Sequence, residues 1–127
     1  MQAPYRIMLL FGTRAEALKL APLIKVMRND PANWQPVIAV APQQSQQEVL
    51  SQTLAYLQVV PDFDLAQTSG RKGAAVEELS GLLHNLNNAI NAGQPDMLLV
   101  VGDAVTSLAA SLVGFYHHLP IGPVSYT

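Results

Sequence analysis

The chain has 127 residues, half of them hydrophobic, and a formal net charge of −2, which predicts one domain, residues 1–127, with a full hydrophobic core. It contains no cysteine, so disulfides and thiolate metal sites are excluded, and its seven basic residues form no stripe of the kind that binds nucleic acid. The apolar start is interrupted at Gly12 and Arg14 and is too short for a signal peptide or a membrane span, so we expect a cytoplasmic protein with no nucleic-acid or membrane partner.

The N-terminal part of the chain reads as a buried strand followed by an amphipathic helix. Residues 5–10 form the apolar run, and the spacing of apolar side chains predicts a helix over residues 16–28. Thr13 and Glu16 have the spacing of a capping box, which makes Thr13 the candidate N-cap. Pro22 falls inside this pattern and is expected to kink the helix or to limit its first part.

The same periodicities continue along the rest of the chain. They predict helices over 46–57, 74–92 and 104–117, and strands over 35–41, 59–65 (a short edge strand), 96–101 and 119–124. Ser45 and Glu48 provide a second capping-box match ahead of the second helix. Strands that alternate with helices in this way predict an α/β fold, a doubly wound, mainly parallel sheet with helices on both faces and right-handed crossovers.

Two junctions share one construction, an apolar strand that runs into a glycine and then into polar residues. Gly12, Thr13 and Arg14 follow the first strand, and Gly102 and Asp103 follow a later one. Ligands of an open parallel sheet bind outside the carboxyl ends of its strands. We therefore expect Arg14 and Asp103 to follow neighbouring strands of one sheet and to face the same crevice.

The first junction has the features of an anion-binding turn. Its glycine permits close approach of a ligand, the helix start offers N–H groups, and Arg14 adds a guanidinium suited to phosphate. The alternative is an ordinary capped turn with a solvated arginine. A dinucleotide-binding fingerprint is excluded, because two of its three glycines are missing. Arg71 and Lys72, between two glycines, provide a second anion contact or a solvated loop.

The second junction carries a carboxylate. Asp103 can orient a sugar hydroxyl or act as a general base, or it can simply cap the helix that follows. A phospho-acceptor aspartate would require further acids after the first strand, where the sequence has Phe11 and Gly12. Two further acids, Asp62 and Asp64, are interpreted as the solvent-facing side of an edge strand rather than as metal ligands.

Three segments, in order along nearly the whole chain, carry a resemblance to a known family. They are FGTRAEALKLAPL at residues 11–23, VPDFDL at 60–65, and PDMLLVVGD at 95–103 followed by SLA at 107–109. Together they resemble the non-hydrolysing UDP-N-acetylglucosamine 2-epimerases, of which the chain would cover the front third. A fragment of a glycosyltransferase with the same broad fold is the alternative, and the first junction favours the epimerase.

The resemblance implies two Rossmann-like domains of the glycosyltransferase-B type with the nucleotide sugar between them, this chain being one half. It implies interconversion of UDP-GlcNAc and UDP-ManNAc, in which loss of the C2 proton and of UDP leaves 2-acetamidoglucal, without metal, nicotinamide or another cofactor. It gives Asp103 a catalytic acid/base role. It assigns the substrate contacts to Gly12, Thr13, Arg14, Glu16 and Gly102. It places a second, regulatory substrate site near Gln43, Gln46 and Arg71.

Several positions depart from the family pattern. Ala15 replaces a proline, Val101 replaces a histidine, and residues 43–47 are rich in glutamine where the family has Gln-His-Arg. Neither a uridine-binding second domain nor a Val-Glu-Ala-Gly segment with a catalytic glutamate occurs in these 127 residues. We therefore expect the chain alone to lack epimerase activity and to bind UDP-sugar weakly or not at all. The alternative is a non-catalytic, degenerate module that forms a homodimer through the helices over 74–92 and 104–117.

Overall fold

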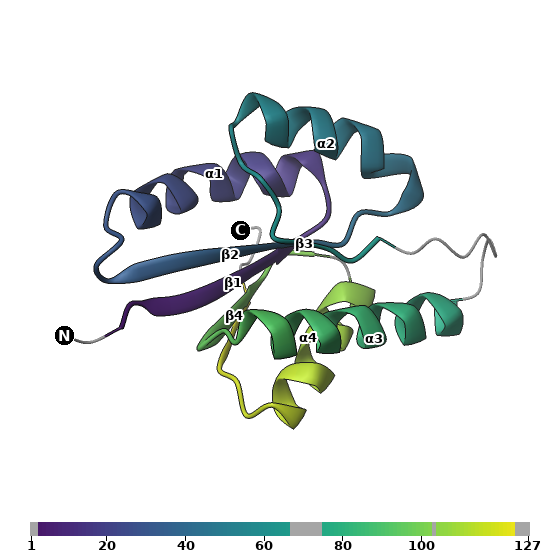
Figure 1. The fold of residues 1–127 in the computed structure, drawn as a ribbon. Helices are drawn as coiled ribbons and strands as arrows, with labels where there is room; N and C mark the ends of the chain where they lie inside the picture. Colours follow the sequence, from purple (N-terminus) through teal and green to yellow (C-terminus); the bar gives the residue numbers. More distant parts are fainter. Residues whose placement is uncertain (1–2, 67–74, 103, 124–127) are drawn as a thin grey trace.

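A computed structural model describes residues 3–66, 75–102 and 104–123 and shows one five-stranded sheet between two pairs of helices (Figure 1). The strands are β1 (Tyr5–Phe11), β2 (Trp34–Val40), β3 (Phe63–Asp64), β4 (Met97–Val100) and β5 (Ile121–Pro123). The helices are α1 (Arg14–Arg28), α2 (Gln47–Tyr56), α3 (Ala75–Gly93) and α4 (Ala104–Tyr116), with a 3-10 turn, η1 (Gln44–Gln46), ahead of α2. All neighbouring strands are parallel, in the order β3-β2-β1-β4-β5.

The helices cover both faces of the sheet, α1 and α2 on one and α3 and α4 on the other (Figure 1). Successive residues of β1 point to opposite faces. Ile7 and Leu9 join the core under α1 and α2, whereas Met8 and Leu10 join the core against α3 and α4. A strand buried on both faces must be apolar throughout, which explains the uninterrupted run that ends at Phe11. The predicted doubly wound α/β fold is confirmed.

The edge strand β3 has two residues and is shorter than the predicted strand over 59–65. Pro61 has no N–H with which to extend the ladder. Asp62 holds the segment instead, since its N–H donates to the carbonyl oxygen of Ile38 (2.8 Å) and its Oδ2 accepts from the N–H of Ile38 (2.7 Å). The Asp62 carboxylate thus accepts the hydrogen bond that a strand carbonyl would accept, and Asp62 pairs with β2. The interpretation of Asp62 as a side chain that only faces solvent is therefore incomplete.

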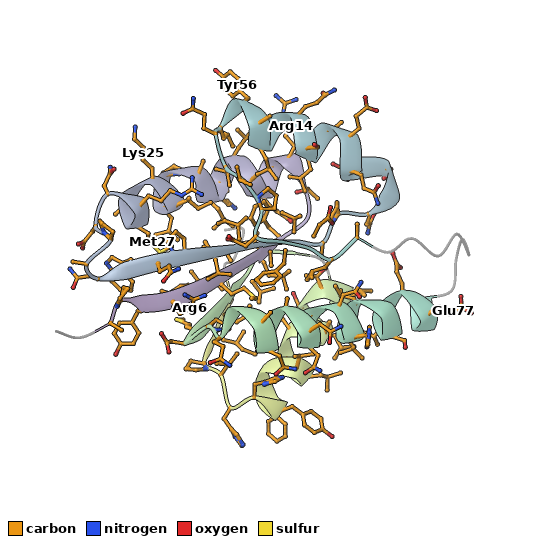
Figure 2. All side chains as sticks on the ribbon, in the orientation of Figure 1. Arg6, Arg14, Lys25, Met27, Tyr56 and Glu77 are labelled. Carbon is orange, nitrogen blue, oxygen red and sulfur yellow. The ribbon has the colours of Figure 1, made fainter. Side chains whose placement is uncertain are left out.

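Asp96 repeats this arrangement ahead of β4. Its N–H donates to the carbonyl oxygen of Arg6 (2.7 Å), and its Oδ2 accepts from the N–H of Arg6 (2.8 Å). The Arg6 Nε in turn donates to the carbonyl oxygen of Gly93 at the end of α3 (2.8 Å; Arg6 is labelled in Figure 2). Both aspartates follow a proline in the sequence, so the two Pro-Asp motifs fix the register of β3 and β4 against the central strands.

We expect Asp96→Ala to lower the free energy of unfolding by about 1–2 kcal/mol, because it leaves the Arg6 N–H without its acceptor. Asp96→Asn keeps an acceptor oxygen and is expected to cost less than about half of that. Urea unfolding followed by circular dichroism measures both, with Glu48→Ala, which removes an exposed acid from α2, as the control. Equal stability of D96A and the wild type would show that the carboxylate does not hold the register.

Two local predictions change. Pro22 does not limit α1, which continues to Arg28 with Pro22 at an exposed position, so this one of its two predicted effects is wrong. Ser45 and Glu48 form no capping box. Ser45 lies inside the 3-10 turn, and the N-cap of α2 is Gln46, which makes no side-chain cap.

Candidate functional site

The two polar junctions follow strands that are neighbours in the sheet. β1 and β4 pair in parallel from Ile7–Met97 to Leu10–Val100, and the Val101 N–H donates to the carbonyl oxygen of Leu10 (2.9 Å). β2 flanks β1 on one side and β4 flanks it on the other, so the direction of winding reverses between β1 and β4. In doubly wound sheets this switch point forms the crevice where ligands bind, outside the carboxyl ends of the strands.

The turn between β1 and α1 is held by the predicted capping box, which is confirmed. The Thr13 Oγ1 accepts from the Glu16 N–H (3.2 Å), and the Glu16 Oε1 accepts from the Thr13 N–H (3.2 Å). The same Oε1 also accepts from the Gly12 N–H (2.8 Å). Glu16 is buried and Arg14 is exposed. The box therefore turns the acid inward and leaves the arginine in solvent.

Close packing accounts for the glycines of both junctions. A Cβ on Gly12 would overlap the carbonyl oxygen of Ala41, the residue after β2. A Cβ on Gly102 would lie 2.9 Å from the Cβ of Thr106, a buried residue near the start of α4. Sequence reasoning did not single out Thr106, although its spacing of four residues from Gly102 across a helix start is a signal of contact. Glycine thus keeps both turns tight against their neighbours.

Arg14 is the basic residue at the switch point. It is the first residue of α1 and lies on the side of the sheet that α1 and α2 cover (Figure 2). Within residues 3–66, 75–102 and 104–123, no hydrogen bond or ion pair engages its guanidinium. An exposed guanidinium with this freedom offers a planar fork of N–H donors to an anion.

The structure brings together part of the predicted regulatory group. Gln43 and Gln46 share the turn after β2, where the Gln46 N–H donates to the carbonyl oxygen of Gln43 (2.8 Å). This turn follows the strand next to β1, so it lies at the same carboxyl edge of the sheet as the Gly12 turn. Arg71 and the catalytic candidate Asp103 lie outside the described residues, and their roles stay predictions.

Two acidic side chains at the edge strand accept hydrogen bonds from backbone N–H groups. Asp62 accepts from the Ile38 N–H (2.7 Å), and the Asp64 Oδ1 accepts from the Ala66 N–H (2.9 Å). Nowhere in the described part of the chain do three or more His, Asp or Glu side chains gather as they would to hold a metal ion. None of the described helices combines the length and the apolar character needed to cross a membrane.

The fold defines a class, a Rossmann-like α/β domain with its switch point between β1 and β4. The chain belongs to the UDP-N-acetylglucosamine 2-epimerase family, whose model matches residues 26–125. It is 38% identical to the UDP-N-acetylglucosamine 2-epimerase of Yersinia pestis and 36% identical to that of Escherichia coli K12. Each match covers 94% of this chain and 31% of the relative.

Solved structures agree with this membership. The UDP-GlcNAc 2-epimerase from Neisseria meningitidis, bound to UDP-GlcNAc, matches with a TM-score of 0.81 and 29% identity over 94% of this chain and 32% of that chain. MnaA from S. aureus, solved with UDP, matches with a TM-score of 0.78 and 34% identity over 94% of this chain and 30% of that chain. The chain thus matches the N-terminal portion of these proteins and spans about a third of their length, and the epimerase interpretation is confirmed over the glycosyltransferase one.

Proposed function

We propose that this chain forms the N-terminal wall of a UDP-sugar site and serves in a UDP-GlcNAc 2-epimerase. The adjacency of β1 and β4 carries the proposal, because it puts the Gly12 turn and Gly102 at neighbouring carboxyl ends of one parallel sheet. The relatives supply the chemical class, since one was solved with UDP-GlcNAc and another with UDP. A single domain over residues 1–127 and a cytoplasmic setting are part of the proposal, supported by the chain's length and its lack of cysteine.

In this proposal each junction has a chemical task. Arg14 contacts the diphosphate, because a guanidinium matches the geometry of phosphate oxygens. Asp103 takes part in removing and returning the C2 proton of the sugar, as a general acid/base. Substrate contacts at the turns come from Gly12, Thr13, Glu16 and Gly102. A second substrate site involves Gln43, Gln46 and Arg71.

The 127-residue chain by itself is expected to bind UDP-sugar weakly and to leave it unreacted. A reaction through 2-acetamidoglucal requires the C2 proton and the departing UDP to be held together in a site that excludes water. One carboxylate on one wall of a cleft can neither orient the sugar nor exclude water. This expectation therefore concerns turnover, and UDP binding is the property to measure first.

Titration with UDP, followed by calorimetry or by amide chemical shifts, tests the proposal. We expect Arg14→Ala to bind UDP at least about tenfold more weakly than the wild type, because a lost hydrogen bond to a charged group costs about 1.5–3 kcal/mol. Lys25→Ala is the control, since it removes the same charge from the last turn of the same helix (Figure 2). Equal affinities of R14A and wild type would contradict the proposal, and robust formation of UDP-ManNAc from UDP-GlcNAc by the isolated chain would contradict the expectation that the chain alone leaves the substrate unreacted.

A second candidate function, self-association through α3 and α4, is favoured by the polarity of that layer. Neither residues 79–93 of α3 nor residues 104–116 of α4 include a charged side chain. The exposed apolar residues of α4 recur at helical spacing, at Leu108, Leu112, Phe115 and Tyr116. We propose that two copies meet through this layer. Such a homodimer is compatible with UDP-sugar binding, because the layer lies on a face of the sheet and the binding edge lies at its carboxyl end.

A further inference from the structure

Among the residues that the structure describes, Glu16 is the only charged residue in the interior, with 6% of its surface exposed. Its Oε1 accepts from the N–H groups of Gly12 (2.8 Å) and Thr13 (3.2 Å). Burial removes a carboxylate from water and is costly unless protein donors replace the lost hydration. The two N–H groups and the positive end of the α1 dipole provide that replacement.

These hydrogen bonds occupy donors that an open helix start would present to a ligand. The first N–H groups of a helix have no partner within the helix itself. Here the Thr13 N–H is taken by Glu16, the Glu16 N–H is taken by the Thr13 Oγ1 (3.2 Å), and the Gly12 N–H is also taken by Glu16. The side chains of Thr13 and Glu16 therefore bind three of the N–H groups of the turn that follows β1.

The same turn includes Arg14, which lies in the sequence between Thr13 and Glu16, the two residues of the capping box. Thr13 and Glu16 flank Arg14 in the sequence and are joined to each other in both directions. The backbone of Arg14 is thus fixed at both of its ends while its side chain stays exposed. A guanidinium on a fixed backbone loses less conformational entropy when it binds than one on a frayed turn.

We infer that Glu16 is a positioning residue, whose carboxylate locks the turn that carries Arg14 and does not touch the UDP-sugar. The inference rests on the proposed function and revises it at three residues, because it removes the substrate contact proposed for Glu16 and leaves Gly12 and Thr13 no backbone N–H contact with the diphosphate. The Gly12 and Thr13 N–H groups, already bound to Glu16, are likewise not phosphate donors. Recognition of the diphosphate at this turn falls to Arg14.

Two variants separate positioning from contact. Glu16→Ala removes the acceptor, whereas Glu16→Gln keeps an acceptor oxygen in a side chain of the same shape without the charge. The readouts are amide hydrogen exchange at Gly12 and Thr13, measured without ligand, and UDP titration. Glu48→Gln, which removes one exposed acidic charge from α2, controls for net charge.

In E16A we expect exchange at Gly12 and Thr13 to be about tenfold faster and UDP affinity to be about tenfold lower, as the loss of hydrogen bonds to a charged acceptor predicts. In E16Q we expect both to stay within about threefold of the wild type. Wild-type UDP affinity in a folded E16A protein would overturn the inference. So would an E16Q protein that loses UDP affinity while Gly12 exchange stays slow, because the carboxylate would then act on the ligand itself.

Failure of the wild-type chain to bind UDP would count against the proposed function. It would not by itself decide whether Glu16 holds the turn in place. The exchange measurement needs no ligand and therefore still tests Glu16 if UDP does not bind. Unchanged exchange at Gly12 and Thr13 in E16A would then overturn the inference that Glu16 holds the turn, and faster exchange would support it. Should E16A not fold, Thr13→Ala removes only the reciprocal bond to the Glu16 N–H. Faster exchange at the Glu16 N–H with weaker UDP binding in T13A would then support the inference, and wild-type values for both would overturn it.

Discussion

Replacement of Gly12 by alanine should destabilise the fold by about 2–3 kcal/mol and abolish UDP binding. The new Cβ would overlap the carbonyl oxygen of Ala41 and lie 3.0 Å from its carbonyl carbon. These are backbone atoms at the end of β2, where the Ala41 N–H donates to the carbonyl oxygen of Phe11 (2.8 Å), so they cannot rotate away as a side chain would. The turn after β1 must shift instead, and Arg14 shifts with it.

Gly93, the last residue of α3, provides the matched control for this variant. A Cβ there would lie 3.1 Å from Cε2 of Phe63 and 3.3 Å from Cε of Met8, both of them side-chain atoms. Small side-chain movements can relieve these contacts, and alanine also lowers the entropy of the unfolded chain, so we expect Gly93→Ala to change stability by less than about 1 kcal/mol. Urea unfolding and UDP titration measure both variants. A G12A protein as stable as the wild type would show that the turn adapts.

Much of the fold could be predicted because burial imposes patterns on the sequence. The apolar run through Ile7 to Phe11 reflects a strand covered on both faces, and the helices show their buried stripes at helical spacing. The expectation that the two junctions follow neighbouring parallel strands is confirmed by the pairing of β1 with β4. The predicted strand over 59–65 is too long, although Pro61, which has no N–H, already indicates a break in the ladder. The hydrogen bonds between Asp62 and Ile38 could not be predicted, because they join residues 24 positions apart.

The spacing of two residues along the sequence does not by itself predict whether they form a capping box. Thr13–Glu16 and Ser45–Glu48 have the same spacing, yet only the first pair forms a capping box. The chain enters α1 in an extended conformation, with φ −129° and ψ 161° at Thr13, which allows a side chain to reach back to the helix start. Ser45 lies in a 3-10 turn that leads directly into α2. The path of the backbone, rather than the residue types, decides between them.

The outer face of α3 and α4 has the composition of an interface. Interface cores are depleted in charge and enriched in aromatic residues. Phe115 and Tyr116 are 79% and 82% exposed, and their rings meet edge to face with centroids 6.5 Å apart. A hydrogen bond between Asn87 of α3 and His117 after α4 (2.7 Å) joins the two helices into one surface. Because residues 79–93 of α3 and 104–116 of α4 include no charged side chain, two copies can approach over this part of the layer without like-charge repulsion.

We expect the wild-type chain to sediment as a dimer and Phe115→Glu as a monomer. Two adjacent helices, the longer of 19 residues, offer roughly 500–600 Å² per copy against about 800 Å² in a standard interface. In so small an area one exposed aromatic carries much of the binding energy, and its loss should cost at least about 2 kcal/mol, or about 30-fold in dimer affinity. Sedimentation equilibrium over a concentration series measures this.

The control for the dimer is an equally exposed aromatic on the other face of the sheet. Tyr56 of α2 is 86% exposed and lies on the side opposite α3 and α4 (Figure 2), so Tyr56→Glu should leave the dimer intact. A wild-type chain that stays monomeric, or equal effects of F115E and Y56E, would contradict the assignment of the interface. F115E should keep the UDP affinity of the wild type, because the helical layer and the carboxyl edge of β1 and β4 are separate surfaces of one sheet.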